Sequence, residues 1–332
     1  MDRAEKNIKN KLNKKGIESK SVSDRILFAA IIVLLVALTL FLIITLTWGL
    51  LTSLKSERDY LKNMFGFPNL NPEYKRNSRE QFFHLKNYSD VLKNFVLTLD
   101  GTYYRGNTPV YSQSTTGFFG MLVNTLLYAG VGGLICAIVP AVTAFLCAKY
   151  KYRLSGIVYV TYIVIMCVPI VGSQPTIISF LRNTGLYDTF IGNYLQKMSG
   201  AGMYFFVYYA FFGGLSNTYR EAAEIDGASE MTILTRIYFP LAVKMLATVF
   251  LIQFVALWND YQTPLLYLPT RPTLSYGVYL VAIDPPSGIN ISDVPHSVSA
   301  CMMLALPILI IFVIFKDKIM GNISLGGIKE EK

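Results

Sequence analysis

Residues 219–229, which read YREAAEIDGAS, bring charged and small side chains together between two strongly apolar stretches. The charged members are Arg220, Glu221, Glu224 and Asp226. A carboxylate and a guanidinium form two parallel, charge-assisted hydrogen bonds, so exposed carboxylates of this kind suit recognition of a basic partner. The segment predicts docking chemistry.

The local pattern predicts a short helix that ends at a glycine. Thr218 and Glu221 have the spacing of a capping box, so we expect the helix to begin at Tyr219. Gly227 is expected to adopt the left-handed conformation that ends a helix. Helical spacing places four residues on one face, and its small side chains allow close approach of a partner: Tyr219, Ala222, Ala223 and Asp226.

A second short helix is expected after the glycine. Ser229 can cap it, and Ala228 joins the two helices. Leu234 lies on its apolar side, and Pro240 stops it or begins the next apolar segment. The alternative is a connector lying on lipid, but lipid-surface helices favour Lys and Arg, whereas this one is acidic. We therefore favour docking into a basic groove of a partner protein.

A second candidate site is the run Trp258, Asn259, Asp260 and Tyr261. It combines aromatic faces with hydrogen-bonding groups, which is what sugar recognition requires. The alternative is a belt of interfacial aromatic residues in which Asp260 faces water. Gln174, with Pro169 and Pro175 beside it, indicates a kink next to a polar group, either a gate on the substrate path or a packing feature.

Enzyme chemistry has no constellation of residues behind it. The chain has no G-x-x-x-x-G-K-[ST] sequence and no H-E-x-x-H sequence, and it has only two histidines. Its four cysteines all fall in apolar segments, with spacing that matches neither a metal site nor a disulfide framework. We expect no catalytic residue, no bound metal and no cofactor in this chain.

The elements that must position these residues are membrane helices. Only 15% of the 332 residues are charged and 53% are apolar, although the net charge is +9. A helix needs about 20 apolar residues to cross a bilayer, and backbone groups in lipid must be satisfied within the segment. Six segments qualify: 26–51, 117–148, 154–181, 201–219, 240–268 and 297–315.

The distribution of Lys and Arg predicts which side of the membrane each loop faces. Basic residues concentrate in the N-terminal tail, in the KYKYR loop, between residues 220 and 244 and in the C-terminal tail. By the positive-inside rule both termini and residues 219–229 are cytoplasmic, and nucleic acid is not the partner. The first apolar segment is too long for a signal peptide and is read as retained.

The run EAAEIDGAS, followed by Ile237 and Pro240, resembles the EAA loop of permeases of ATP-binding-cassette (ABC) importers. More narrowly, it looks like the carbohydrate-uptake branch that includes the maltose permease pair, on the side of the smaller, six-span subunit. Leu234 stands where that family usually has Phe. Other matching stretches are TSLKS, NYSDVL, NTLLYA, GLYDTFIG, WNDYQTPLLYL and FKDKIMGNISLGGIK.

The resemblance implies an all-α membrane protein with six transmembrane helices, the type I ABC importer permease fold, and cytoplasmic EAA coupling helices. The implied organisation is a cytoplasmic tail (1–25), a first helix (26–51), an extracytoplasmic loop (52–116), a five-helix core with its coupling loop at 217–240 (117–316) and a cytoplasmic tail (317–332). The long loop is either an added contact surface for a binding protein or tolerated length.

The resemblance also implies partners in a cell membrane. They are a second permease in a heterodimer, two copies of an ABC ATPase that hold ATP and Mg, and an extracytoplasmic binding protein that delivers a sugar or oligosaccharide. Glu221 is then the residue expected to pair with an ATPase arginine. The alternatives are a non-sugar solute carried by the same architecture, and an ion-coupled secondary carrier, for which Asp260 is the one candidate carboxylate.

Overall fold

The computed structural model describes residues 22–68, 83–105, 108–150, 152–168, 172–198, 202–283 and 293–320. The chain divides into two compact units, residues 1–84 and residues 85–332. Each unit is described by itself. Pro169 and the terminal tails 1–21 and 321–332 lie outside the described residues.

The first unit is built on helix α2 (Val22–Ser53) and the short helix α3 (Glu57–Lys62). Within α2, residues 26–53 form a strongly apolar stretch long enough to cross a membrane, as predicted for residues 26–51. The turn after α2 is held by Lys55, whose buried ammonium donates to the carbonyl oxygens of Asn63 (2.6 Å) and Met64 (3.1 Å). This turn lies outside the spanning segment, and burial lowers the pKa of Lys55 there.

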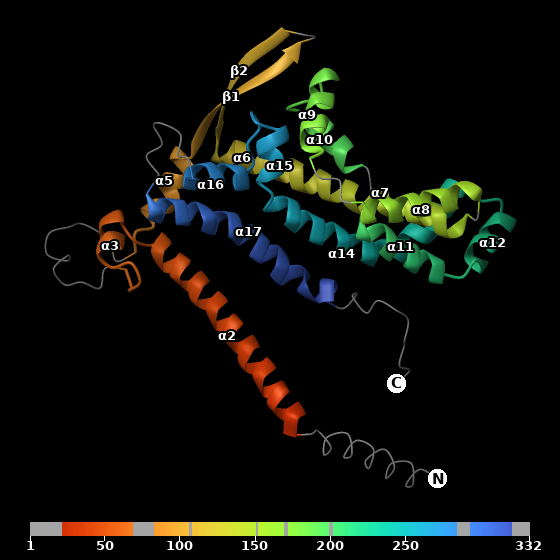
Figure 1. Ribbon diagram of the computed structural model, residues 1–332, viewed down its shortest axis with the longest axis horizontal. Coiled ribbons are helices and arrows are strands. Elements are labelled where there is room, and N and C mark those ends of the chain that lie inside the picture. The colour runs from red at the N-terminus through yellow and green to blue at the C-terminus, as the bar shows by residue number, and fades with distance from the viewer. Residues whose placement is uncertain are drawn as a thin grey trace. The chain divides into compact units, whose positions relative to one another are not determined.

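The second unit begins with α5 (Lys86–Asn94) and an antiparallel hairpin of β1 (Val96–Arg105) and β2 (Thr108–Gly117). The register pairs Val96 with Gly117 and Arg105 with Thr108. The prediction of an all-α chain was wrong here, because residues 52–116 were read as a loop. Figure 1 shows the hairpin projecting past α6, and β1 also contacts α9.

A continuous apolar rod follows the hairpin. It consists of α6 (Phe118–Leu126), the π-helical turn η1 (Leu127–Val131) and α7 (Gly132–Lys149). It packs along α14 (Phe239–Trp258), and a Cβ on Gly133 would lie 3.3 Å from the Phe254 backbone nitrogen. Gly133 therefore permits close approach of α7 and α14.

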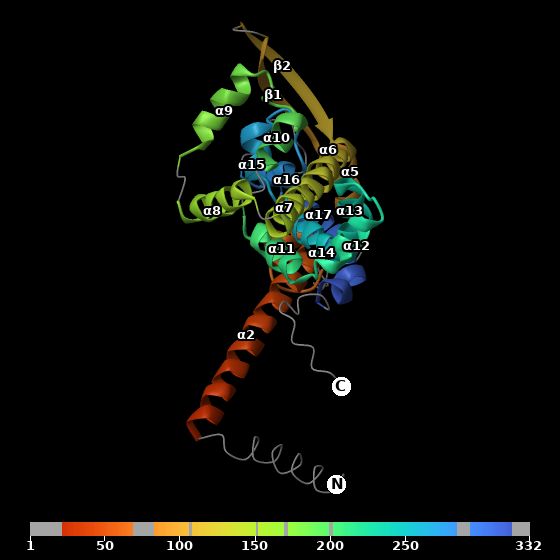
Figure 2. The same ribbon diagram turned by 90° about the vertical axis from the view of Figure 1, so that its right-hand side faces the viewer.

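The predicted third span (154–181) was wrong as a single helix. The chain forms α8 (Arg153–Cys167) and a separate α9 (Gln174–Asn183), and the two run in different directions in Figure 2. Pro175 lies in the first turn of α9, where its missing N–H needs no partner, so it begins that helix and does not kink it. The short α10 (Phe190–Lys197) follows.

The predicted fourth and fifth spans also have different bounds. α11 covers only Met203–Gly214, whereas 201–219 was expected. The helical stretch that includes α14 begins earlier, with α13 (Glu230–Ile233) and the π-helical turn η2 (Leu234–Tyr238), and it ends at Trp258 instead of Leu268. The remaining helices are α12 (Thr218–Ile225), α15 (Gln262–Tyr267), α16 (Leu274–Ile283) and α17 (Val294–Met320).

By length and composition, four helices within the described residues can cross a membrane: 26–53, 118–149, 230–258 and 294–315. The apolar helices α8, α11 and α16 are shorter. Buried apolar side chains of the second unit form two clusters. One gathers residues of α5, β1, α6, η1, the end of α14, α16 and α17, and the other gathers residues of α7, α8, α11 and α12–α14.

Candidate functional site: the α12–α13 loop

The C-terminal end of α12 has the predicted glycine cap. Gly227 has φ of +75°, its amide donates to the Glu224 carbonyl (3.0 Å), and the Ala228 amide donates to the Ala223 carbonyl (2.9 Å). These two bonds form a Schellman motif, in which the positive φ favours glycine. The bend at Gly227 is therefore set by the local sequence.

The N-terminal end of α12 differs from the prediction. The helix begins at Thr218, and the preceding Asn217 has helical backbone angles and no side-chain cap. The Asn217 amide oxygen instead accepts from Lys149 (3.1 Å), and the Ser216 hydroxyl accepts from the Thr218 amide (3.2 Å). The predicted capping box was wrong, and the Glu221 carboxylate is not used to begin the helix.

The second helix begins as predicted. The Ser229 hydroxyl accepts from the Thr232 amide at 3.2 Å and caps α13. The π-helical turn η2 follows, and Pro240 then occupies the first turn of α14. A proline inside a helix clashes with the carbonyl four residues before it, so a widened turn at this position accommodates the ring.

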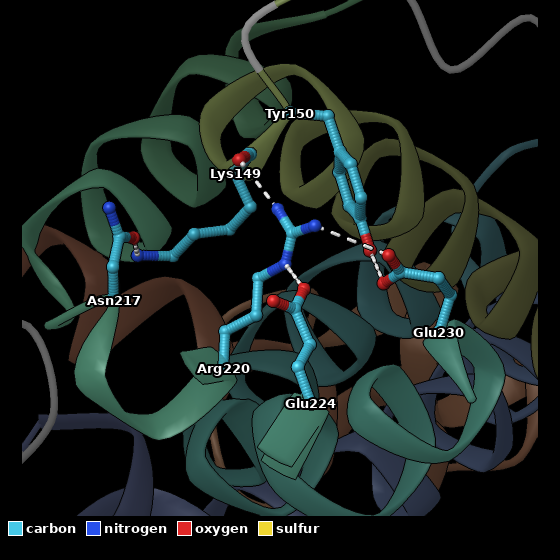
Figure 3. Close-up of polar contacts among 6 residues, drawn as sticks. All are labelled: Lys149, Tyr150, Asn217, Arg220, Glu224 and Glu230. Atoms are coloured by element: carbon cyan, nitrogen blue, oxygen red, sulfur yellow. Dashed lines mark hydrogen bonds and ion pairs between the residues drawn. The ribbon is translucent and has the colours of Figure 1, made fainter. Parts of the chain in front are cut away.

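Arg220 is the centre of a polar network that holds α12 and α13 to the end of α7 (Figure 3). Its guanidinium lies 2.6 Å from Glu224, 3.2 Å from Glu230 and 3.3 Å from the Lys149 carbonyl. The Tyr150 ring lies 4.3 Å beneath the guanidinium, and its hydroxyl donates to Glu230. One planar cation therefore joins three elements.

Lys149 anchors the start of the same loop. Its buried ammonium donates to the Leu215 carbonyl at 2.6 Å and to Asn217 (Figure 3). It also lies over the ring of Tyr238, 5.4 Å from the centroid. The entry into α12 and the exit through η2 therefore contact the same lysine.

The contacts leave one set of side chains facing outward. Glu224 and Glu230 are engaged by Arg220, whereas Glu221 and Asp226 are exposed and make no side-chain hydrogen bond or ion pair with the described residues. Ile225 is 86% exposed. We call the following set the α12–α13 face: Tyr219, Glu221, Ala222, Ile225, Asp226 and Met231.

This face differs from the predicted one at Ala223. Ala223 is buried in the cluster formed with α7, α8, α11 and α14, so it packs the loop against its own chain. Leu234 and Ala228 are partly buried against the same cluster. Periodicity alone placed Ala223 with Ala222, whereas tertiary packing puts the boundary of the exposed face between them.

The second candidate site has a mainly structural arrangement. Trp258 is almost fully buried, and its indole N–H donates to the Leu304 carbonyl at 3.0 Å. Asn259 is exposed and donates to the Val255 carbonyl of its own helix (2.9 Å). Tyr261 stacks on Tyr279 with ring centroids 4.3 Å apart. Trp258 therefore packs between helices.

Asp260 joins residues that are far apart in the sequence. Its carboxylate accepts from the Tyr128 hydroxyl (2.6 Å) and from the Thr263 amide (3.0 Å). The Lys197 ammonium donates to the same Tyr128 oxygen at 3.2 Å. Burial lowers the pKa of Lys197, and the charge of Asp260 opposes that shift. Sequence reasoning missed Tyr128 and Lys197, because neither lies near Asp260 in the chain.

Gln174 begins α9 on the surface, and no hydrogen bond joins its side chain to the segment 258–261 within the described residues. Within those residues no group of three or more His, Cys, Asp or Glu side chains could hold a metal ion. The described structure therefore adds neither a gate at Gln174 nor a metal site.

Known proteins resemble this chain over most of its length. It is 25% identical to the melibiose/raffinose/stachyose import permease MelC of Bacillus subtilis, over 62% of this chain and 75% of that protein. It is 30% identical to the sn-glycerol-3-phosphate transport system permease UgpE of Shigella flexneri, over 62% of this chain and 73% of that protein.

A solved structure has the same fold. It belongs to a bacterial ABC transporter involved in the import of the acidic polysaccharide alginate, and it matches with a TM-score of 0.65 and 20% identity over 90% of this chain and 98% of the solved one. Residues 131–321, more than half of the chain, match the family described as binding-protein-dependent transport system inner membrane component. The chain therefore belongs to this family of ABC importer permeases.

Proposed function

We propose that this protein is the transmembrane subunit of an ATP-driven importer, and that it translocates a sugar or oligosaccharide delivered by an extracytoplasmic binding protein. The observation that carries the proposal is the α12–α13 face. Arg220 and Lys149 hold this loop against α7, and its outward side chains combine unpaired carboxylates with exposed apolar groups. A rigid surface of this kind transmits movement only if a partner binds it.

The partner that supplies energy is an ABC ATPase. Because Glu224 and Glu230 are held by Arg220, Glu221 is the carboxylate available to an arginine in the ATPase groove. Ile225 and Met231 provide the apolar contact beside it. Two ATPase copies bind ATP and Mg beneath a heterodimer of permeases, and this chain itself performs no catalysis.

The topology consistent with this arrangement puts the α12–α13 loop and both termini in the cytoplasm of a six-span, multi-pass membrane protein. The two crossings added to the four long helices are formed by α8 and α11. With 15 and 12 residues these helices are about 22 Å and 18 Å long, shorter than a hydrocarbon core of about 30 Å. Non-helical backbone is tolerated at that depth where protein covers it.

A sugar is the favoured solute class because the resemblance to the carbohydrate-uptake branch extends along most of the sequence. MelC, named for melibiose, raffinose and stachyose import, agrees with it. The second candidate is a small phosphorylated solute, which UgpE favours through its name for sn-glycerol-3-phosphate transport. An ion-coupled carrier is disfavoured, because both oxygens of Asp260 already accept hydrogen bonds.

Affinity purification of this chain from its native membrane tests the proposal. We expect an ABC ATPase and a second six-span permease to co-purify, and the reconstituted complex with its binding protein to hydrolyse ATP faster when a transported saccharide is added. Uptake by this chain alone, abolished by an ionophore and indifferent to ATP, would refute the importer. Stimulation by glycerol phosphates and by no saccharide would replace the sugar with the second solute class.

A further inference from the structure

The inner face of α10 carries polar side chains with unused hydrogen-bonding capacity. Asn193 is 1% exposed, and both its amide nitrogen and its amide oxygen are buried without a hydrogen-bond partner among the described residues. The amide nitrogen of Gln196, three positions along, is in the same condition. Buried polar groups are nearly always satisfied, so neighbouring exceptions on one helix require an explanation.

Lys197 lies on the same face, four positions after Asn193. Its ammonium has three N–H donors, and within the described residues its one hydrogen bond is to the Tyr128 hydroxyl at 3.2 Å. No carboxylate of the described residues lies within 4.0 Å of it. The nearest negative charge, on Asp260, is reached through the Tyr128 hydroxyl.

Residues of neighbouring elements fix the position of the Lys197 side chain. A Cβ on Gly132 would lie 3.3 Å from the side-chain carbons of Lys197, so the glycine leaves room for the lysine stem. Tyr194 fixes α10 by donating to the Leu127 carbonyl at 2.8 Å. A lysine at a helix C-terminus is favourable by itself, but that does not account for the unpaired amides of Asn193 and Gln196.

The balance of donors and acceptors indicates what would bind. Among the buried atoms without a partner, the donors are the amide nitrogens of Asn193 and Gln196 and the acceptor is the Asn193 amide oxygen, and the Lys197 ammonium adds further donors. A ligand complementary to this face is rich in acceptors and negatively charged, because an ammonium without a direct counter-ion gains most from an anion. Hydroxyl groups beside that anion would engage the amides.

We propose that Asn193, Gln196 and Lys197 form a contact site for the transported solute, and that this solute is an oligosaccharide bearing carboxylate groups. The proposal rests on the proposed function and narrows its substrate class. Tyr128 and Asp260 are positioning residues, because the phenol, polarised by Asp260, directs the ammonium. Asp260 therefore influences solute binding indirectly, by positioning Tyr128 and through it the Lys197 ammonium.

Uptake of two saccharides of equal length, one neutral and one with uronate carboxylates, tests the site in the complete complex with its binding protein. For Lys197→Gln we expect a loss of uronate uptake of at least tenfold and a change in neutral uptake of less than twofold. Lys197→Arg should recover most of the uronate uptake. Lys93→Gln, at an exposed position outside α10, is the control for removal of one positive charge.

Three results would overturn the site. They are a parental complex that takes up neutral saccharides and no uronate, an equal fall in both activities for Lys197→Gln at normal membrane abundance, and unchanged uptake of both. An equal fall would mean that the polar face pairs with protein in another conformation. Failure of the parental complex to take up any saccharide would refute the proposed function itself, and is thus distinguishable.

Discussion

Two cationic side chains of this protein, Arg220 and Lys197, occupy contrasting environments. Arg220 is paired directly with two carboxylates of the loop and with a backbone carbonyl at the end of α7. Lys197 reaches its carboxylate only through a phenol, and it lies beside amides that have no partner among the described residues. Arg220 therefore holds the loop in place, whereas Lys197 retains hydrogen-bond donors that a ligand could use.

The contrast separates rigidity from binding. In the α12–α13 loop, Arg220 pairs with Glu224 and Glu230, so it is not available to Glu221. Glu221 therefore remains exposed to a partner protein. Around α10 the opposite holds, because the buried amide groups of Asn193 and Gln196 have no hydrogen-bond partner among the described residues. Substitutions that disrupt the α12–α13 loop should alter the coupling of ATP hydrolysis to uptake. Substitutions confined to the packing between helices should alter stability alone.

The largest effect is expected for Glu221→Lys, which reverses the one unpaired glutamate on the α12–α13 face. Uptake should fall more than tenfold while ATP hydrolysis continues, because an ATPase arginine would face a like charge. Insertion should be unchanged, and the matched control is Glu57→Lys at an exposed position in the first unit. Paired measurements of uptake and ATP hydrolysis in vesicles decide it, and parental uptake by the variant contradicts docking through Glu221.

Arg220→Ala should have the next largest effect. It removes both ion pairs and the bond to the Lys149 carbonyl, so the loop loses its connection to α7. We expect a several-fold loss of ATPase co-purification, with incomplete recovery in Arg220→Lys, which lacks the planar fork. Proteolysis of the loop should accelerate in parallel. A loop that stays protected in Arg220→Ala would show that the network does not hold it.

Gly227→Leu should cost about 1–2 kcal/mol locally, because a branched side chain is strained at φ of +75°. No atom lies within 4 Å of the position that a Cβ would occupy, so the cost arises from the backbone alone. Thermal unfolding of the purified complex measures it, and Gly227→Asn should retain more stability because Asn tolerates this conformation. Equal stability of Asn, Leu and Gly at this position would argue against the strain.

Trp258→Phe should have the smallest effect on transport. The substitution removes the indole hydrogen bond to the Leu304 carbonyl, a net loss of about 0.5–1.5 kcal/mol. We expect a lower unfolding temperature with an unchanged KM for the saccharide. A raised KM without loss of stability would place Trp258 on the substrate path after all.

Local signals were read correctly from the sequence. The positive φ of Gly227, the cap at Ser229 and the apolar helix over residues 26–51 depend on a few neighbouring residues or on composition. The exposed face was only partly predicted, because the burial of Ala223 depends on α7, α8, α11 and α14. The capping box failed for a related reason, since the Asn217 side chain is held by Lys149, 68 positions earlier.

Other features had no signal that hydropathy can detect. The division between α8 and α9 does not interrupt the apolar run, so a window over residues 154–181 reads it as one segment. Tyr128 and Asp260 meet across 132 positions, and a single sequence contains no information on that pairing. The hairpin was the exception, because β-branched and aromatic residues are frequent in residues 96–117 and favour strands.

The most direct test of energy coupling through the α12–α13 face is site-specific photocrosslinking in the assembled complex. A photoreactive residue at position 225, whose parental side chain is 86% exposed, is compared with one at position 191, 64% exposed on α10. We predict an adduct with the ABC ATPase from position 225 and none from position 191. Equal labelling from both positions, or an adduct from position 225 with lipid alone, would contradict the account.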